Sequence, residues 1–490
     1  MTNYFIDHDA KEGQLSGTLT FTNGSDQVTG SGTQFTTELQ VGDYIISDDP
    51  TYGKEWYKVV EIIDDVTLRI DHAFYQDTHS STASYNKQSN VTNGGTSASY
   101  DSGTGVGPFC HIQQFFDIAQ AGDIGYVRRG KTYYSSQQLE PVNDGTAGSY
   151  IVLMGDDGTG WPDESGLAKP IIDLTGATYA RIYFYADLYY YLKDIKIFHG
   201  QIFNSRSPSN RFEKIDIDVD TLSYSGLYIA YSTAHIEDCK SNGRGSTDGG
   251  LKIDHAFVIV KDSEFWNVYS GDTPAIHIEY LALGYIWNCK TGTSHAGTRD
   301  IQVRYGRDGN SLRFKGYKFA TTEHVFLVSP IGEVNILFED YDGTVGAHKI
   351  YRTTATIERD TSEYTGNASD SVKIIPTSYA PQMPQYPVFE WKITNVSAAE
   401  HTVTVYVKGS GWTTLPTADE LYIEVEYYDE STGTHTATAK SSEVLDANDT
   451  WKAFTVTFTP AQDGDIYVRG YLKKYEDGAV VWFNGEVEIT

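Results

Sequence analysis

Sulfur-containing residues are scarce in this chain of 490 residues, which has three cysteines and three methionines. The cysteines, Cys110, Cys239 and Cys289, follow neither the spacing of zinc ligands nor that of a disulfide framework. Cys239 and Cys289 occupy equivalent places in the repeat described below, so we expect them to be small, buried apolar residues. The sequence therefore excludes a fold organised by zinc or by disulfides.

Long apolar runs are also absent. No stretch approaches the roughly 20 apolar residues that a membrane-spanning helix needs. Residues 1–13 are polar and charged, without the apolar segment of a secretory signal peptide. We expect a polar tail over residues 1–13, synthesis in a cytoplasm, no membrane insertion, and exit by another route such as lysis.

Positive charge is in short supply, because 37 Lys and Arg residues stand against 66 Asp and Glu, for a formal net charge of −29. This charge disfavours nucleic acids and anionic membrane surfaces as partners. An acidic surface keeps a large β protein soluble. Bound divalent cations, Ca²⁺ among them, are the alternative explanation; we expect no other cofactor.

What the sequence does contain is a repeat between about residues 173 and 341. Each repeat is marked by a polar or glycine residue followed by a residue of an alternating apolar run, at steps of 20, 24, 24, 26, 28 and 24 residues. The marker pairs are Asp194-Ile195, Lys214-Ile215, Asp238-Cys239, Asp262-Ser263, Asn288-Cys289, Gly316-Tyr317 and Asp340-Tyr341. A second column of apolar runs, which contains Leu227, Leu251, Ile276 and Ile301, keeps the same period. Two columns of short strands at one period predict a parallel β-solenoid.

The segment before the repeat supports this prediction. Ile112, Phe115, Phe116 and Ala119 follow the i, i+3, i+4, i+7 pattern of an amphipathic helix. A strand pattern over 122–133 and a Gly-Thr-Ala-Gly turn at 145–148 come next. This succession resembles the beginning of the pectate-lyase-like right-handed β-helix superfamily, in which a short helix caps the first coil. The resemblance implies a right-handed parallel β-helix over residues 109–345.

The flanking regions complete an all-β chain. Residues 14–88 contain short strands separated by turns, which predict a small β-barrel; the stretch 29–43 resembles a β module that recurs near the N-termini of bacteriophage tail and fibre proteins. We interpret residues 89–108 as a linker and residues 346–385 as a cap and linker. Six alternating runs over 386–490 predict a β-sandwich, whose ending is similar to the jelly rolls of carbohydrate-binding modules.

One outward row of the predicted solenoid is aromatic. Alternate residues of a β-strand point away from the core, and equivalent positions on successive coils stack about 4.8 Å apart. Tyr183, Phe203 and Tyr228 share such a row. Exposed aromatic rings stack on sugar rings, so we predict that these residues bind a glycan.

The same columns bring charged residues together farther along the chain. Lys252, Asp254, His277, Glu279 and Arg304 fall in two neighbouring outward rows. Carboxylates on adjacent coils fit the roughly 5–5.5 Å separation of a retaining glycosidase, a histidine can transfer protons, and the cations can neutralise a uronate. Rows of alternating charge also form ladders that only solvate a sheet, so catalysis and solvation both remain open.

Three further acidic residues, Asp216, Asp218 and Asp220, share one face of a predicted strand. Their spacing of roughly 6–7 Å needs additional ligands before it can hold one Ca²⁺ ion. A weak cation site and a solvated acidic face are the two interpretations.

Together these features favour a structural protein of a bacteriophage virion, of tail-spike, fibre or particle-decorating type. The resemblance implies contacts with other virion proteins through the N-terminal module, and a homotrimer; a host-surface polysaccharide is the expected ligand. The main alternative is a polysaccharide depolymerase, either a lyase or a glycoside hydrolase, that acts from the solenoid face. A bacterial adhesin or surface-layer component is a third possibility.

Overall fold

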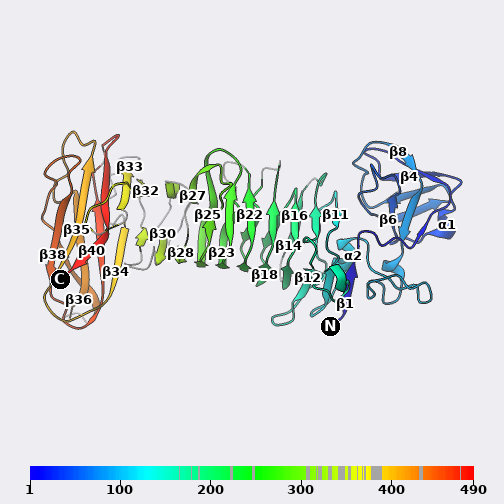
Figure 1. Cartoon of the computed structure of the whole chain (residues 1–490), viewed down its shortest axis with the longest axis horizontal. Helices are drawn as coiled ribbons and strands as arrows, with labels where there is room; N and C mark the ends of the chain where they lie inside the picture. The colour runs from blue at the N-terminus through cyan, green and yellow to red at the C-terminus, as the bar shows by residue number, and fades with distance from the viewer. Residues whose placement is uncertain are drawn as a thin grey trace. The chain divides into compact units, whose positions relative to one another are not determined.

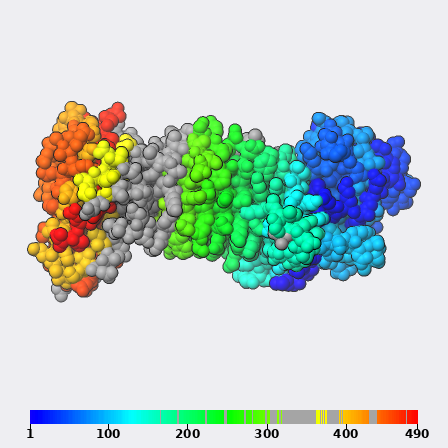
Figure 2. All heavy atoms as spheres, viewed as in Figure 1, coloured from blue at the N-terminus to red at the C-terminus, as the bar shows by residue number. Residues whose placement is uncertain are grey.

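The structure is a computed structural model of the whole chain. It describes residues 1–490 except 165, 178, 186–187, 221–223, 245–248, 305–309, 316, 318–322, 329–333, 340–347, 351–354, 361, 367, 369–370, 377–388, 430–433 and 475, which are grey in Figures 1 and 2. The repeat markers Gly316, Asp340 and Tyr341, and parts of the predicted cap and linker over 346–385, lie outside the described residues. The chain folds as two compact units, Met1–Arg244 and Gly245–Thr490.

Both units are built from β-strands, so the all-β prediction is confirmed. The only α-helices among the described residues are α1 (Phe35–Glu38) and α2 (Ile112–Ile118). Within the described part of the chain, no helix has the length and apolar character needed to cross a membrane.

Most of the first unit is a stack of parallel strands, which lie side by side in Figure 1. The first set is β1 (Asn3–Ile6), β10 (Ile124–Val127), β12 (Ile151–Gly155), β15 (Tyr190–Lys193), β18 (Asn210–Glu213) and β21 (Thr233–Glu237). The second is β14 (Arg181–Tyr185), β17 (Gln201–Ser205) and β20 (Leu227–Ala230). The third is β11 (Thr132–Tyr134), β13 (Ile171–Asp173), β16 (Lys196–Phe198), β19 (Asp216–Asp218) and β22 (Lys240–Gly243). From β13 onward the chain visits the third, second and first sets in turn.

The corners of this stack explain the repeat seen in the sequence. Asp194, Lys214 and Asp238 adopt left-handed backbone conformations with φ of 55°, 55° and 51°. Their partners in the marker pairs, Ile195, Ile215 and Cys239, are buried. Side chains without a branched β-carbon tolerate the left-handed region better than β-branched ones. Each marker pair is therefore a corner residue followed by a residue that packs inside the stack.

The predicted amphipathic helix is confirmed as α2. Its residues Ile112, Phe115 and Phe116 are buried, and it begins with a capping box between His111 and Gln114. The Phe115 ring packs against Gly125 of β10, where an added Cβ would lie 3.0 Å from the ring. The helix therefore packs on the first strands of the stack, which suits a capping role.

The prediction of a polar tail over residues 1–13 is wrong. Residues Asn3–Ile6 form β1, which pairs in parallel with β10. The other edge of β1 is also occupied, because Phe5 N–H donates to Gly95 O (2.7 Å) and Phe109 N–H donates to Phe5 O (2.8 Å). Gly95, in the segment expected to be a linker, thus hydrogen-bonds to β1, and together with Phe109 it covers an edge that would otherwise be open.

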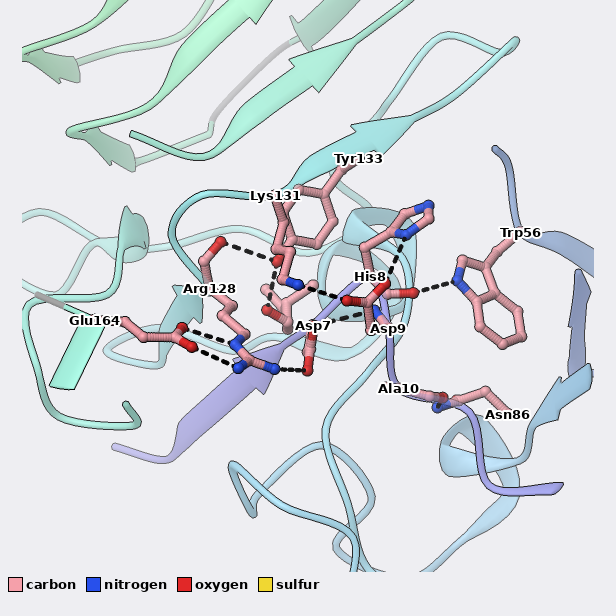
Figure 3. Close-up of polar contacts among 11 residues, drawn as sticks. Asp7, His8, Asp9, Ala10, Trp56, Asn86, Arg128, Lys131, Tyr133 and Glu164 are labelled. Atoms are coloured by element: carbon pink, nitrogen blue, oxygen red, sulfur yellow. Dashed lines mark hydrogen bonds and ion pairs between the residues drawn. The ribbon is translucent and has the colours of Figure 1, made fainter. Parts of the chain in front are cut away.

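Polar contacts fix the residues that follow β1 (Figure 3). The Asp7 carboxylate accepts from Arg128 (2.8 Å), whose guanidinium also binds Glu164. Lys131 Nζ donates to Asp9 (2.6 Å), and Trp56 Nε1 donates to the carbonyl of His8 (2.8 Å). These bonds tie the N-terminal segment both to the parallel stack and to the small module inserted after it.

That module is an antiparallel sheet of eight strands with its own apolar core, which includes Phe21, Phe35 and Leu68. Its strands are β2 (Gly13–Gln14), β3 (Thr18–Phe21), β4 (Gln27–Ser31), β5 (Tyr44–Ser47), β6 (Tyr57–Asp64), β7 (Thr67–Ile70), β8 (His79–Ser81) and β9 (Ala83–Asn86). Strand β6 pairs with β5 through Tyr57 and Lys58 and with β7 through the residues from Val59 to Asp64. In the sequence, the module is inserted between β1 and β10 of the stack.

The second unit begins with parallel strands and ends with antiparallel ones. The parallel strands are β23 (Leu251–Lys261), β25 (Gly271–Trp287), β27 (Gly297–Arg304), β28 (Asn310–Lys315), β29 (Glu323–Val328), β30 (Val334–Glu339), β24 (Glu264–Asn267) and β26 (Lys290–Thr291). Asp262 and Asn288 repeat the left-handed corner, each with φ of 50°. The repeat thus continues with the same corner geometry in this unit.

The rest of this unit is antiparallel. After β31 (His348–Ile350) and β32 (Ala355–Asp360), the strands are β33 (Ser371–Pro376), β34 (Phe389–Val396), β35 (His401–Ser410), β36 (Leu421–Asp429), β37 (Thr434–Lys440), β38 (Lys452–Phe458), β39 (Gly464–Leu472) and β40 (Val480–Ile489). They pair in the orders β34-β39-β36-β37 and β33-β40-β35-β38. Trp391, Val405 and Phe454 belong to the one core that both groups share.

The corner geometry predicts the effect of a substitution at Lys214. Lys214→Val should lower the free energy of unfolding by about 1–2 kcal/mol, because a branched side chain is strained at positive φ. Lys214→Gly should leave it unchanged or higher. Lys240→Val, which removes the same charge from a strand, is the matched control. Urea unfolding measures all three, and equal stability of the Lys214→Val and Lys214→Gly variants would contradict the account.

Candidate functional site

The predicted aromatic row is formed by adjacent strands of the first unit. Tyr183 of β14 is in register with Phe203 of β17, which is in register with Tyr228 of β20. The Tyr183 and Phe203 ring centroids are 5.2 Å apart at 27°, and those of Phe203 and Tyr228 are 4.6 Å apart at 9°. Parallel pairing in register therefore produces a continuous stack of three rings.

Two arginines complete this surface. The guanidinium of Arg181 lies 4.4 Å from the ring centroid of Tyr183, 5.2 Å from that of Phe203 and 5.1 Å from that of Tyr179. Arg206 lies 5.4 Å from the ring centroid of Tyr185, and its Nη1 donates to the Tyr185 hydroxyl at 2.8 Å. We call this group the aromatic–arginine patch; its members are Tyr179, Arg181, Tyr183, Tyr185, Phe203 and Arg206.

Accessibility separates the roles of the rings in the patch. Stacked neighbours occupy faces of the Phe203 ring, which limits its direct contact with a sugar. Tyr185 and Tyr179 are 43% and 59% exposed. An accessible aromatic ring beside a guanidinium offers a flat apolar face together with several hydrogen-bond donors. The patch can therefore bind a ring-shaped ligand that carries polar substituents.

The charged rows of the second unit have the predicted register. Lys252 pairs with His277, and Asp254 pairs with Glu279, which in turn pairs with Arg304. The predicted exposure of two of them is wrong, because Asp254 is only 7% exposed and His277 is fully buried. Alternation in a sequence indicates which side chains of a strand point away from the apolar core, but not whether the face that they form is exposed to solvent. The side chain of Arg304 lies outside what the structure describes.

The buried charges of this group are neutralised locally. Lys252 Nζ lies 3.2 Å from Glu279 Oε2, and His277 Nε2 lies 4.0 Å from Glu279 Oε1. Asp254 Oδ1 lies 2.6 Å from His255 Nδ1. Pairing of this kind offsets the cost of removing charges from water. The group holds residue types suited to acid–base chemistry, but their carboxylates already have partners.

The three aspartates proposed for a cation each have a different partner. Asp216 lies 3.0 Å from Lys169 Nζ, Asp218 accepts from Asn242 (2.9 Å), and Asp220 lies 2.8 Å from His199 Nε2. Within the described residues, no three or more His, Cys, Asp or Glu side chains are grouped to hold a metal ion. The structure therefore does not bring these aspartates together as ligands.

A cluster that the sequence did not reveal lies between the module and the stack. The Glu55 carboxylate is buried and accepts from the main-chain N–H of Ser136 at 2.5 Å. His72 bridges Glu55 (Nε2 to Oε1, 3.2 Å) and Asp71 (Nδ1 to Oδ1, 2.9 Å). Burial opposes the charged imidazolium, but the hydrogen bonds and charges of Asp71 and Glu55 outweigh burial and raise the pKa of His72 to about 9. His72 is thus a cation that joins two carboxylates at this junction.

Comparison with known proteins gives little further support. No family model and no curated protein matches the chain. Among solved structures, a xylan-binding CBM22-2 domain of Paenibacillus barcinonensis Xyn10C is 13% identical over 31% of this chain and 96% of that chain, with a TM-score of 0.21.

Two further similar structures come from an enzyme and a phage. A CBM22-1–GH10 xylanase structure of Clostridium thermocellum is 14% identical over 28% of this chain but only 24% of that chain, with a TM-score of 0.20. The tailspike protein 4 enzymatically active domain of bacteriophage CBA120 is 10% identical over 89% and 72% of the two chains, with a TM-score of 0.20. TM-scores this low carry no argument, so we infer function from the residues of this chain alone.

Sequence patterns could have revealed some of the residues that they missed. Arg181 and Tyr185 lie two positions on either side of Tyr183, so strand alternation places all three on one face. Arg206 sits at a left-handed corner with φ of 59°, where no sequence rule predicts an arginine. Glu55 and His72 come together only through the fold.

The His72 bridge predicts how stability depends on pH. The folded-state pKa of about 9 exceeds the ordinary value of about 6.5, so the folded protein holds this proton more tightly than the unfolded chain. The stabilisation, about 3 kcal/mol, should be complete below pH 6.5 and disappear as pH rises through 9. Unfolding at pH 6 to 10 measures it, and His72→Gln should flatten this part of the profile. An unchanged slope in the variant would contradict the assignment.

Proposed function

We propose that this chain is a structural protein of a bacteriophage particle, of tail-spike, fibre or decoration type, that binds host-surface polysaccharide through the aromatic–arginine patch. One observation carries the binding proposal: accessible tyrosines and arginines of the stack lie together beside a row of aromatic rings. Aromatic rings with adjoining hydrogen-bond donors suit a sugar, which has an apolar ring face and a polar rim.

The finer architecture belongs to the same proposal. We infer that the parallel strands form a right-handed β-helix, the eight-stranded module a small barrel, and the C-terminal strands a jelly-roll-like sandwich. The order in which the chain visits three sets of strands supports the β-helix. The inserted module is the segment that we assign to contacts with other virion proteins.

Binding of this kind requires no catalysed reaction. Parallel strands in register hold the rings in place before a ligand arrives, so little conformational entropy is lost on binding. A particle carries many copies, and we propose that the chain is a homotrimer. Weak sites linked on one particle then act together, and avidity exceeds the affinity of one site.

A second candidate function is cleavage of polysaccharide by the group around Glu279. It is favoured by the approach of a lysine and a histidine to one carboxylate, at 3.2 and 4.0 Å. The burial of Asp254 and His277 counts against it, because a polymer must reach the acid and the base. Shortening of a polysaccharide that is lost on Glu279→Gln would establish this function.

Substitution of Tyr185 tests the binding function. Tyr185→Ala should weaken retention of the protein on immobilised host-surface polysaccharide at least tenfold, because an exposed aromatic contact is lost. Tyr100→Ala removes another tyrosine of the first unit with a similar exposure, 44%, and should leave retention unchanged. Equal retention of both variants at equal melting temperature would exclude this patch as the binding site.

A further inference from the structure

We infer that the aromatic–arginine patch selects anionic polysaccharides, those whose sugars carry a carboxylate, over neutral ones. The inference rests on the proposed function and names the class of glycan that this site takes. It assigns ring stacking to Tyr185 and recognition of the sugar's charge to Arg206 and Arg181.

The two arginines differ in their partners from three others of the same unit, although Arg211 also lies over a tyrosine ring, that of Tyr150. Arg69, Arg128 and Arg129 each form an ion pair with an Asp or Glu side chain. Among the described residues, the ion pairs of the first unit include neither Arg181 nor Arg206. Both guanidiniums instead contact aromatic rings and neutral hydrogen-bonding groups. Their charge is therefore not neutralised by a described carboxylate in contact.

A neutral side chain separates Arg181 from the nearby acid. Nε of Arg181 donates to Gln138 Oε1, and Gln138 Nε2 donates to Glu140 Oε2 at 3.0 Å. The Gln138 amide therefore bridges the guanidinium of Arg181 and the carboxylate of Glu140 by hydrogen bonds. The positive charge of Arg181 is thus kept next to the aromatic rings.

The geometry places the charges beside the ring that a sugar can reach. The Tyr183 and Tyr185 ring centroids are 5.6 Å apart, with Arg181 against the first ring and Arg206 against the second. A guanidinium over a ring keeps hydrogen-bond donors at its edge, where it can bind a carboxylate through two parallel bonds. A sugar stacked on Tyr185 would therefore present a carboxylate substituent to Arg206.

The net charge of the chain, −29, opposes the binding of any polyanion, so a preference for an acidic polymer must come from the local charges of Arg181 and Arg206. Such a protein repels polyanions except where a local cationic site compensates. Nucleic acids also combine rings with negative charge, but a double helix, with one charge per about 1.7 Å of its axis, meets stronger repulsion from this chain. An acidic polysaccharide is thus the occupant to which we commit, and single-stranded DNA is a competitor in the test.

The experiment measures binding of the full chain to alginate, polygalacturonate and hyaluronate, each beside its carboxyl-reduced form, in 0.1 M salt. Single-stranded DNA is included as a second polyanion. The variants are Arg206→Gln, Arg206→Lys and Arg181→Gln, and the control is Arg69→Gln, which removes an equal charge from an ion pair elsewhere in the first unit. Melting temperatures establish that each variant is folded.

The expected result is that at least one acidic polymer binds tenfold or more tightly than its reduced form. Arg206→Gln should remove this preference, Arg206→Lys should restore only part of it, and Arg69→Gln should leave it unchanged. Equal binding of acidic and reduced polymers that is lost on Tyr185→Ala would overturn the inference and preserve the proposed function. Binding of no polymer would overturn both, and binding of single-stranded DNA as tight as that of the acidic polymer would overturn the choice of ligand.

Discussion

Parallel pairing in register, repeated from one strand to the next, is the constraint on which the stack depends. Register is maintained only if the chain turns the corner between the sets of strands with the same geometry each time. The left-handed residues Asp194, Lys214 and Asp238 provide that corner. The main-chain hydrogen bonds between neighbouring strands continue directly after the corner, where Lys240 N–H donates to Ile215 O at 2.8 Å. The period of the sequence is therefore the period of a backbone conformation. Substitutions at Lys214 and Asp238 should affect the fold more than their exposed side chains suggest.

The same register places the candidate ligand-binding surface. Because Tyr183, Phe203 and Tyr228 occupy equivalent positions on paired strands, strand register alone brings their rings into a stack. The charged rows of the second unit are also held in register, but there Lys252 and Glu279 form an ion pair that neutralises both charges. A repeating scaffold thus supplies rows of side chains, and local charge balance determines which row has capacity for a ligand. We propose that the charges of Arg181 and Arg206 retain that capacity in the aromatic–arginine patch.

Sequence patterns predicted features that depend on local physics. The marker pairs, the helix from Ile112 to Ile118 and the register of the aromatic row follow from turn chemistry and periodicity. The sequence patterns did not predict contacts between segments that are distant in the chain. Nothing local indicates that Asn3–Ile6 pairs with β10, that His277 is covered, or that Glu55 meets His72. Such contacts depend on the path of the chain between the partners, which periodicity does not report.

Hydroxyl-radical footprinting of the protein with and without a bound acidic polysaccharide would locate the binding surface, because it reports the accessibility of individual tyrosine side chains. If the aromatic–arginine patch binds the polymer, the polysaccharide should protect Tyr179 and Tyr185 from oxidation, while Tyr100 and Tyr364, which are also exposed, react as before. Protection confined to residues of the second unit, with Tyr179 and Tyr185 unchanged in a bound complex, would contradict binding at this patch.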